Sequence, residues 1–137
     1  MIQKAERIIE AYQKVKPAGC GVIAMDGRAA AGKTTLAEEL AVTLGGAVVH
    51  MDDFFLPGEL RTPERLAAPG GNVHAERFAE EVLPYLRRGE AFRYRRFDCH
   101  RMDYNGWVEI PPVPVIIVEG AYSQHPRFGG YADLTVF

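Results

Sequence analysis

The chain has 137 residues, 47% of them hydrophobic, and a formal net charge of −2. This length suits one globular domain with a single apolar core, and the nearly balanced charge argues against a protein that binds DNA or RNA. Cys20 and Cys99 form no CxxC pair, and the longest apolar runs are strand-sized, so neither a disulfide framework, a structural zinc site nor a membrane span is indicated. We therefore expect a cytoplasmic protein that contacts neither nucleic acid nor membrane.

The first segment is predicted to be an amphipathic helix. Apolar residues recur at steps of three and four from Ile2 to Val15, with charged residues between them, so one stripe can pack on a sheet. Pro17 and Gly19 end this helix. The apolar run GVIAMD at 21–26 then predicts a buried strand.

The sequence GRAAAGKT at 27–34 follows that strand and has the spacing of a P-loop, and a helical pattern continues to Leu44. Glycines let the backbone turn sharply, so that amide N–H groups and the N-terminus of the next helix converge on phosphate oxygens. Lys33 adds a full positive charge, and the Thr34 hydroxyl suits Mg²⁺. The sequence therefore predicts a triphosphate site. Its expected cofactor-binding residues are Gly27, Ala30, Ala31, Gly32, Lys33, Thr34 and Thr35.

Two carboxylates follow the next predicted strand. Residues 47–55, AVVHMDDFF, form a short apolar strand that runs into Asp52 and Asp53. Ligand sites of open α/β sheets lie beyond the carboxyl ends of the strands, so both acids should face the same crevice as the P-loop. Because side chains alternate along an extended segment, only one of them would point at the substrate. Either acid is thus a candidate general base, and the alternative is a pair that merely solvates a turn.

The middle of the chain predicts a covering segment and a hairpin. Residues 56–71 carry three prolines and three glycines, which is typical of a loop or lid. A helical pattern returns over 73–88, and Pro84 should kink or divide it. Residues 92–96 and 107–110 then predict the strands of a hairpin or small flap, with Asn105-Gly106 as the turn signal.

The last part of the chain predicts another buried strand that ends in an acid. Residues 115–120, VIIVEG, contain four consecutive β-branched residues, as a strand covered on both faces requires. Glu119 stands at the carboxyl end, where P-loop proteins often place the carboxylate that holds the hydration shell of Mg²⁺. A connection at 121–132 then leads to a final apolar strand at 133–137.

These segments together resemble the uridine kinase and phosphoribulokinase branch of P-loop kinases, especially its bacterial uridine kinase-like members. From Gly21 onward the resemblance is carried, in the family's order, by GRAAAGKT, MDDFF, NVHAERF, YRRFD, IIVEGAYS and YADLTVF. The D-x-F-aromatic segment singles out this branch. The resemblance implies an α/β fold, a three-layer α/β/α P-loop NTPase domain with a mainly parallel sheet over residues 1–137. It also implies ATP and Mg²⁺ as cofactors, and transfer of the γ-phosphoryl group to a hydroxyl of a small metabolite such as uridine.

The resemblance also implies roles for individual residues. Asp52 matches the acid that takes the proton from the acceptor hydroxyl, Phe55 matches an aromatic of the nucleoside pocket, and residues 72–74 match the part that contacts the ribose. The expected catalytic residues are Asp52, Lys33 and Glu119, and the expected metal ligands are Thr34, Glu119 and Asp52. The expected substrate contacts are Asp53, Phe55, His74, Tyr94, Asp98 and His100.

Two departures keep alternatives open. The family's uridine kinases carry an aspartate for the ribose hydroxyls where this chain has His74, which leaves the acceptor open. Pantothenate or a sugar phosphate is a second class of acceptor, because the kinases of those compounds share the architecture. The family also continues past residues 134–137 with an arginine-bearing lid helix and a fifth strand, so we expect a C-terminally incomplete domain. Its last strand would offer an edge to a second copy of the chain. The missing lid favours a nucleotide-binding module without phosphotransfer, whereas Asp52 disfavours it.

Overall fold

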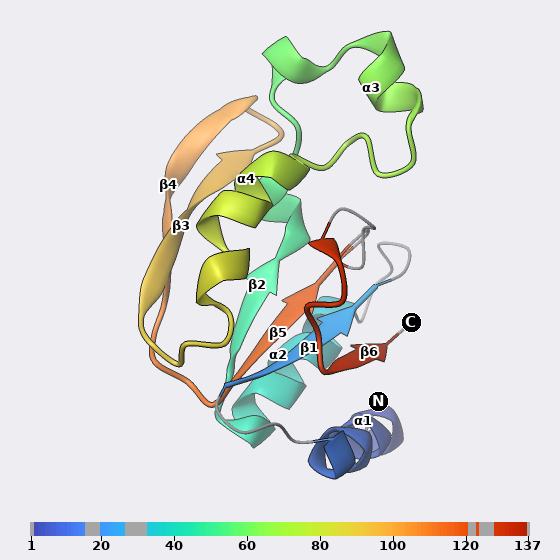
Figure 1. The fold of residues 1–137 in the computed structure, drawn as a ribbon, viewed down its shortest axis with the longest axis vertical. Coiled ribbons are helices and arrows are strands. Elements are labelled where there is room, and N and C mark those ends of the chain that lie inside the picture. The colour runs from blue at the N-terminus through green and yellow to red at the C-terminus, as the bar shows by residue number, and fades with distance from the viewer. Residues whose placement is uncertain (1, 16–19, 27–32, 121–122, 124–127, 137) are drawn as a thin grey trace.

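The computed structural model describes residues 2–15, 20–26, 33–120, 123 and 128–136 (Figure 1). Its main sheet consists of β1 (Gly21–Met25), β2 (Ala47–His50), β5 (Val115–Glu119) and β6 (Leu134–Val136). These strands lie in the order β2-β5-β1-β6, and every pair among them is parallel. From β1 the chain first forms β2 and β5 on one side of β1, and it then forms β6 on the other side. Such a switch point is where open α/β sheets place their ligands.

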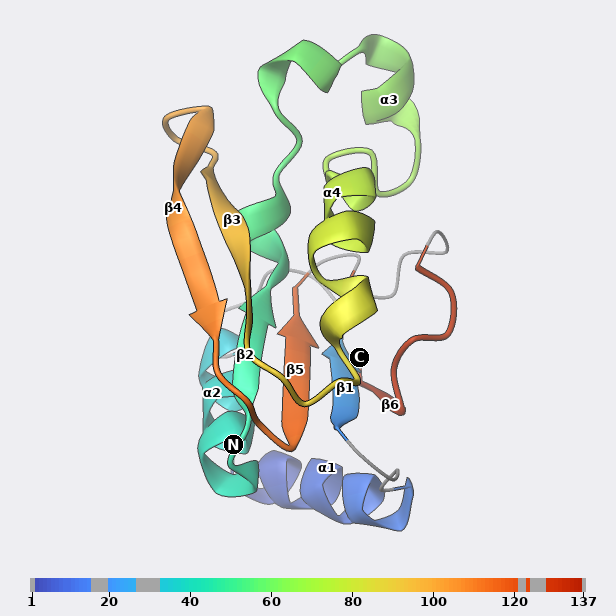
Figure 2. The same ribbon diagram turned by 60° about the vertical axis from the view of Figure 1, so that its left-hand side comes forward.

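Two separate layers cover the faces of this sheet (Figures 1 and 2). Helices α1 (Ile2–Val15) and α2 (Lys33–Leu44) pack on one face, and α4 (Ala75–Glu81) packs on the other with the antiparallel hairpin of β3 (Phe92–Asp98) and β4 (Asp103–Ile110). Side chains alternate across each strand, so Ile117 joins the core under α1 and α2, whereas Val118 joins the core under α4. The predicted three-layer α/β/α architecture is confirmed.

Several predicted elements are confirmed at their predicted positions. The first helix spans residues 2–15, the helix after the predicted P-loop spans 33–44, and β5 is buried along its whole length. The helix over 73–88 is divided as expected: α4 ends at Glu81, and a 3₁₀ turn, η3 (Leu83–Tyr85), carries Pro84.

The turn of the β3–β4 hairpin differs from the sequence prediction. It lies at residues 99–102, whereas Asn105 and Gly106 are inside β4. The pairing of the two strands shifts between Arg95 and Phe97, so β4 carries an extra residue there. Gly106 has a φ of +78°, a conformation that suits a bulge as well as a hairpin turn. The Asn105-Gly106 pair therefore does indicate a residue with positive φ, but this residue lies in a bulge of β4 and not in the hairpin turn.

The segment predicted as a loop or lid contains two short helices, η2 (Gly58–Leu60) and α3 (Pro63–Ala67). Thr62 caps the N-terminus of α3, because its hydroxyl accepts a hydrogen bond from the Arg65 N–H, and Pro63 occupies the first turn. The segment projects beyond the sheet on the side of its carboxyl ends (Figure 1). Along the described parts of the chain, no helix is both long and apolar enough to cross a membrane.

Candidate active site

The carboxyl ends of the parallel strands gather the predicted site residues. β1 ends at Met25 and α2 begins at Lys33, so the strand and the helix that flank a P-loop are both present. The predicted phosphate-binding residues Gly27, Ala30, Ala31 and Gly32 lie outside the described residues, as do the side chains of Lys33 and Thr34. On the same edge, His50 at the end of β2 pairs in register with Glu119 at the end of β5.

Glu119 is a buried carboxylate with a histidine partner. The residue is 4% exposed, and its Oε1 lies 2.6 Å from Nδ1 of His50. The hydrogen bond to Glu119 raises the pKa of His50, although burial acts in the opposite direction. The sequence prediction placed Glu119 at this edge but missed His50. That pairing depends on β2 and β5 being neighbours, which the spacing of residues in the chain does not reveal.

The two acids after β2 lie in a 3₁₀ turn, η1 (Met51–Phe54), and the predicted extended conformation is wrong. The 3₁₀ helix repeats every three residues, so Met51 and Phe54 share one face, and both are buried. Asp52 and Asp53 occupy the positions between them. Asp52 is exposed, whereas the side chain of Asp53 is only 14% exposed. The two acids therefore differ in exposure because of the 3₁₀ geometry, and the expectation that only one of them points at the substrate stays a prediction.

Gly120 allows the chain after β5 to pass directly against this turn. Its φ is +129°, and a Cβ at this position would lie 2.8 Å from Cβ of Met51. Its N–H donates to the carbonyl of Met25, which ties the ends of β5 and β1 together. A residue without a side chain is required here, since both the backbone conformation and the close approach exclude a methyl group.

Replacing Gly120 by alanine is expected to destabilise the fold by about 1–3 kcal/mol, because alanine must adopt a strained φ and displace Met51. Urea unfolding would measure this loss. Gly130→Ala is the matched control, since no atom lies within 4 Å of a Cβ built there and its φ is not positive. Equal stability of the two variants would contradict the requirement for glycine.

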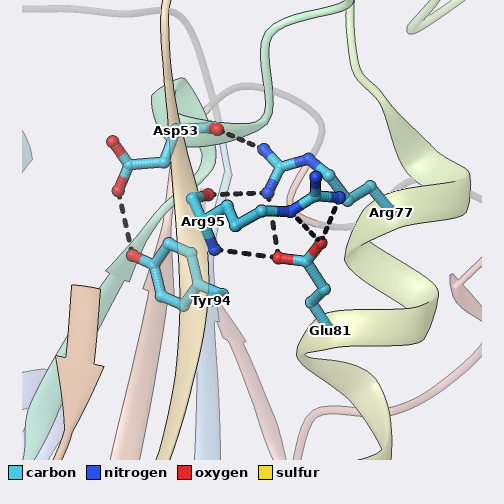
Figure 3. Close-up of polar contacts among 5 residues, drawn as sticks. All are labelled: Asp53, Arg77, Glu81, Tyr94 and Arg95. Carbon is cyan, nitrogen blue, oxygen red and sulfur yellow. Dashed lines mark hydrogen bonds and ion pairs between the residues drawn. The ribbon is translucent and has the colours of Figure 1, made fainter. Parts of the chain in front are cut away.

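Arg77 of α4 links three elements next to η1, which we call the acid turn because it carries Asp52 and Asp53 (Figure 3). It is 3% exposed, and its Nη1 donates to the carbonyl of Arg95 at 2.6 Å and to Oε1 of Glu81 at 3.1 Å. Its Nη2 donates to the carbonyl of Asp53. The guanidinium carbon also lies 4.2 Å from the centroid of the Phe54 ring. Arg77 and Glu81 were not predicted; their i,i+4 spacing on a helix was visible in the sequence, but an exposed pair has the same spacing.

The carboxylate of Asp53 is held by Tyr94 of β3. The Tyr94 hydroxyl donates to Oδ2 of Asp53 at 2.9 Å, and Nε of Arg96 lies 3.8 Å from Oδ1. Burial raises the pKa of Asp53, and the Tyr94 hydrogen bond opposes that rise. Tyr94 itself is completely buried, and burial together with the Asp53 charge raises its pKa. The prediction that Tyr94 contacts substrate is not supported, because its ring belongs to the core and it reaches the site through Asp53.

Comparison with known proteins identifies this arrangement of strands and helices. No family model matches the sequence. A possible uridine kinase from Bacillus stearothermophilus is 21% identical with a TM-score of 0.79, over 97% of this chain and 78% of that one. A candidate fructose transport system kinase from Silicibacter sp. TM1040 is 25% identical with a TM-score of 0.74, over 96% and 72%. The D-glycerate 3-kinase of Cryptococcus neoformans is 20% identical with a TM-score of 0.65, over 86% and 51%. The chain has the fold of the P-loop kinases.

The donor set at the sheet edge fits the metal that a P-loop kinase fold implies. Among the residues that the structure describes, no group of three or more His, Cys, Asp and Glu side chains could hold a metal ion. Mg²⁺ in phosphoryl-transfer sites keeps several waters and takes only one or two protein oxygens besides the phosphates. One buried carboxylate, Glu119, at the end of β5 therefore suits a nucleotide-bound Mg²⁺ better than a dedicated protein cage.

In this P-loop kinase fold, two of the remaining predicted substrate residues, Phe55 and His74, lie next to the hairpin and to α4. The Phe55 ring stacks on Phe97 at 6.5 Å between centroids, and the Arg61 guanidinium lies 4.6 Å from the Phe55 ring. His74 precedes α4; its Nδ1 is buried without a hydrogen-bond partner, and burial lowers its pKa. An unpartnered buried nitrogen is costly, so His74 remains a candidate for a ligand contact.

Asp98, His100 and Thr35 have other surroundings. Oδ1 of Asp98 accepts hydrogen bonds from the backbone N–H groups of His100 and Arg101, so this carboxylate shapes the hairpin turn. His100 is exposed at the same turn. Thr35 is exposed on α2 and borders a groove between α1 and α2. Contacts of these three residues with substrate or nucleotide stay predictions.

Glu81→Gln is expected to weaken the fold in a pH-dependent way. Burial raises the pKa of Glu81, but hydrogen bonds from the backbone and guanidinium of Arg95, together with the charges of Arg77 and Arg95, lower it below its ordinary value of 4.5. Because the folded pKa lies below the unfolded one, this stabilisation is present above about pH 4.5 and is lost as the pH falls through the folded pKa. We expect a loss of about 1–3 kcal/mol at pH 7.

Urea unfolding at pH 7 and at pH 3.5 would test this expectation. The difference between the wild-type protein and Glu81→Gln should narrow at the lower pH, because the carboxylate of the unfolded chain has the higher pKa and takes up a proton first. Glu80→Gln, at the exposed neighbouring position, should have little effect at either pH. A difference that is the same at both values would show that the charge of Glu81 does not matter.

Proposed function

We propose that this protein is a small-molecule kinase that transfers the γ-phosphoryl group of ATP to a hydroxyl. The observation that carries the proposal is that three features meet at the carboxyl ends of the parallel strands. These features are the start of α2, which follows β1 in the chain, the buried Glu119 at the end of β5, and the 3₁₀ turn η1 with its two acids after β2. A module that only binds nucleotide has no need of an exposed acid such as Asp52 at the carboxyl ends of the strands. The kinases among the similar structures support the same reaction class.

Each part of the site has a role in this proposal. The N-terminus of α2 and the Lys33 ammonium would hold the phosphates, and the Thr34 hydroxyl with Glu119 would hold Mg²⁺ directly or through water. When bound, Mg²⁺ would supply positive charge that neutralises the phosphate oxygens. Asp52 would orient the acceptor hydroxyl and take its proton. Positioning and charge neutralisation therefore account for most of the expected rate enhancement.

The acceptor that we place first is a nucleoside such as uridine. The resemblance of the D-x-F-aromatic segment and the similarity to a possible uridine kinase support it. A sugar, sugar acid or sugar phosphate is the second candidate. Two observations favour it: similar structures are named as kinases of fructose transport and of D-glycerate, and His74 replaces the family's ribose-binding aspartate. Burial lowers the pKa of His74, and a neutral imidazole offers a vicinal diol fewer acceptor atoms than a carboxylate.

A screen of ATP consumption tests the proposal directly. The protein with Mg²⁺-ATP would be incubated with uridine, cytidine, pantothenate, fructose, D-glycerate and sugar phosphates, and ADP release and phosphorylated product would be measured. We expect a nucleoside to give the highest kcat/KM. Turnover of fructose or D-glycerate alone would move the assignment to the second candidate. ATP binding without turnover of any acceptor would favour a binding module and refute the kinase proposal.

A further inference from the structure

The turn that carries Asp52 is fixed from two sides by buried polar groups. Figure 3 shows the carboxylate of Asp53 directed to Tyr94 and its carbonyl oxygen directed to Arg77. We propose that Arg77 is a positioning residue for phosphoryl transfer, and that its guanidinium clamps η1 so that Asp52 stays aligned with the acceptor hydroxyl. This inference rests on the proposed function, because it takes Asp52 as the acid at the acceptor.

The contacts of Arg77 suit a clamp. Its guanidinium reaches oxygens on three elements: the carbonyl of Asp53 in η1, the carbonyl of Arg95 in β3, and the carboxylate of Glu81 in α4. Only the planar fork of arginine presents several donors in fixed directions; a lysine ammonium is a single point on a flexible stem. The acid turn, the hairpin and α4 are therefore held in one fixed relation by one side chain.

Glu81 fixes the guanidinium in turn. Its Oε1 accepts from both Arg77 and the Arg95 backbone N–H, and its Oε2 accepts from the Arg95 guanidinium at 2.8 and 3.0 Å. Arg77 also packs over the ring of Phe54, the last residue of η1. A need for core volume alone would be met by an apolar side chain with a smaller desolvation cost. The hydrogen bonds from Arg77 to two backbone carbonyls indicate that its role is to hold η1 and β3 in a fixed relative position.

The second anchor separates the roles of the two acids. The Asp53 carboxylate lies between the Tyr94 hydroxyl and the Arg96 guanidinium and is largely buried. Asp52, one residue earlier, is exposed. The geometry makes Asp53 the anchor of the turn and leaves Asp52 for the acceptor. Because a displacement of about 1 Å at a reacting group can cost about 100-fold in rate, a loosened anchor should appear in kcat.

Arg77→Lys is the decisive variant, with Arg93→Lys on the exposed face of β3 as its control. We expect Arg77→Lys to lower kcat by about 10–100-fold with the best acceptor, while the KM for ATP stays within about twofold. Tyr94→Phe keeps the buried ring and removes only the hydroxyl, so it should lower kcat by a smaller factor with an unchanged KM for ATP. Arg93→Lys should match the wild-type protein in both constants.

Amide hydrogen exchange provides a readout that does not depend on turnover. In Arg77→Lys, exchange should accelerate at residues 51–55 and stay unchanged along α2. A wild-type kcat in Arg77→Lys would overturn the inference. So would a parallel loss of kcat, ATP affinity and melting temperature with exchange raised throughout the sheet, because Arg77 would then be structural only. If the wild-type protein phosphorylates no acceptor, the proposed function fails on its own, and the exchange result alone decides whether Arg77 clamps the turn.

Discussion

Asp52→Asn is expected to lower kcat for phosphoryl transfer by about 10²–10⁴-fold and to leave ATP binding nearly unchanged. Asparagine keeps the size of the side chain and can still contact the hydroxyl, but it cannot accept the proton. Since Asp52 is exposed in η1, the substitution breaks no buried contact, and the fold should be retained. Steady-state kinetics with the acceptor identified by the screen would measure kcat, and calorimetric titration with an ATP analogue would measure affinity.

Asp53→Asn is the comparison that gives this prediction its specificity. Its amide oxygen can still accept the hydrogen bond from the Tyr94 hydroxyl, so the turn should keep its anchor and kcat should fall much less. The reverse order of effects would identify Asp53 as the base and Asp52 as the solvated neighbour. Full turnover in both variants would show that neither acid takes the proton, and the proposed mechanism would have to be abandoned.

The sequence was most informative where local physics decides the structure. The helices at 2–15 and 33–44 and the buried strand at 115–119 were predicted at their observed positions, because periodicity and β-branched runs are properties of neighbouring residues. The 3₁₀ conformation of the acid turn could also have been predicted from the sequence. Two large apolar residues, Met51 and Phe54, stand three apart, which is the repeat of a 3₁₀ helix and does not fit an alternating strand.

What the sequence could not reveal depends on contacts between distant segments. His50 meets Glu119 only because β5 lies next to β2, and Arg77 reaches Asp53 only because α4 and the hairpin enclose the turn. The same limit explains Tyr94. An aromatic residue in a segment expected to bind substrate is compatible with either a pocket or a core, and its complete burial could be read only from the packed structure.

Lys33→Ala is expected to abolish tight ATP binding, with Kd rising by about 30–5,000-fold. Lys33 begins α2, directly after the Gly-x₄-Gly segment, so its ammonium and the helix N-terminus would act on the same phosphates. Removing one partner of a desolvated charge pair costs about 2–5 kcal/mol, which corresponds to that range of affinity.

Lys14→Ala, at an exposed position near the end of α1, is the matched loss of a lysine and should leave Kd unchanged. Titration of both variants with a fluorescent ATP analogue would measure the difference. Wild-type affinity in Lys33→Ala would mean that the phosphates bind elsewhere, and the roles proposed for Glu119 and Asp52 would lose the nucleotide on which they depend.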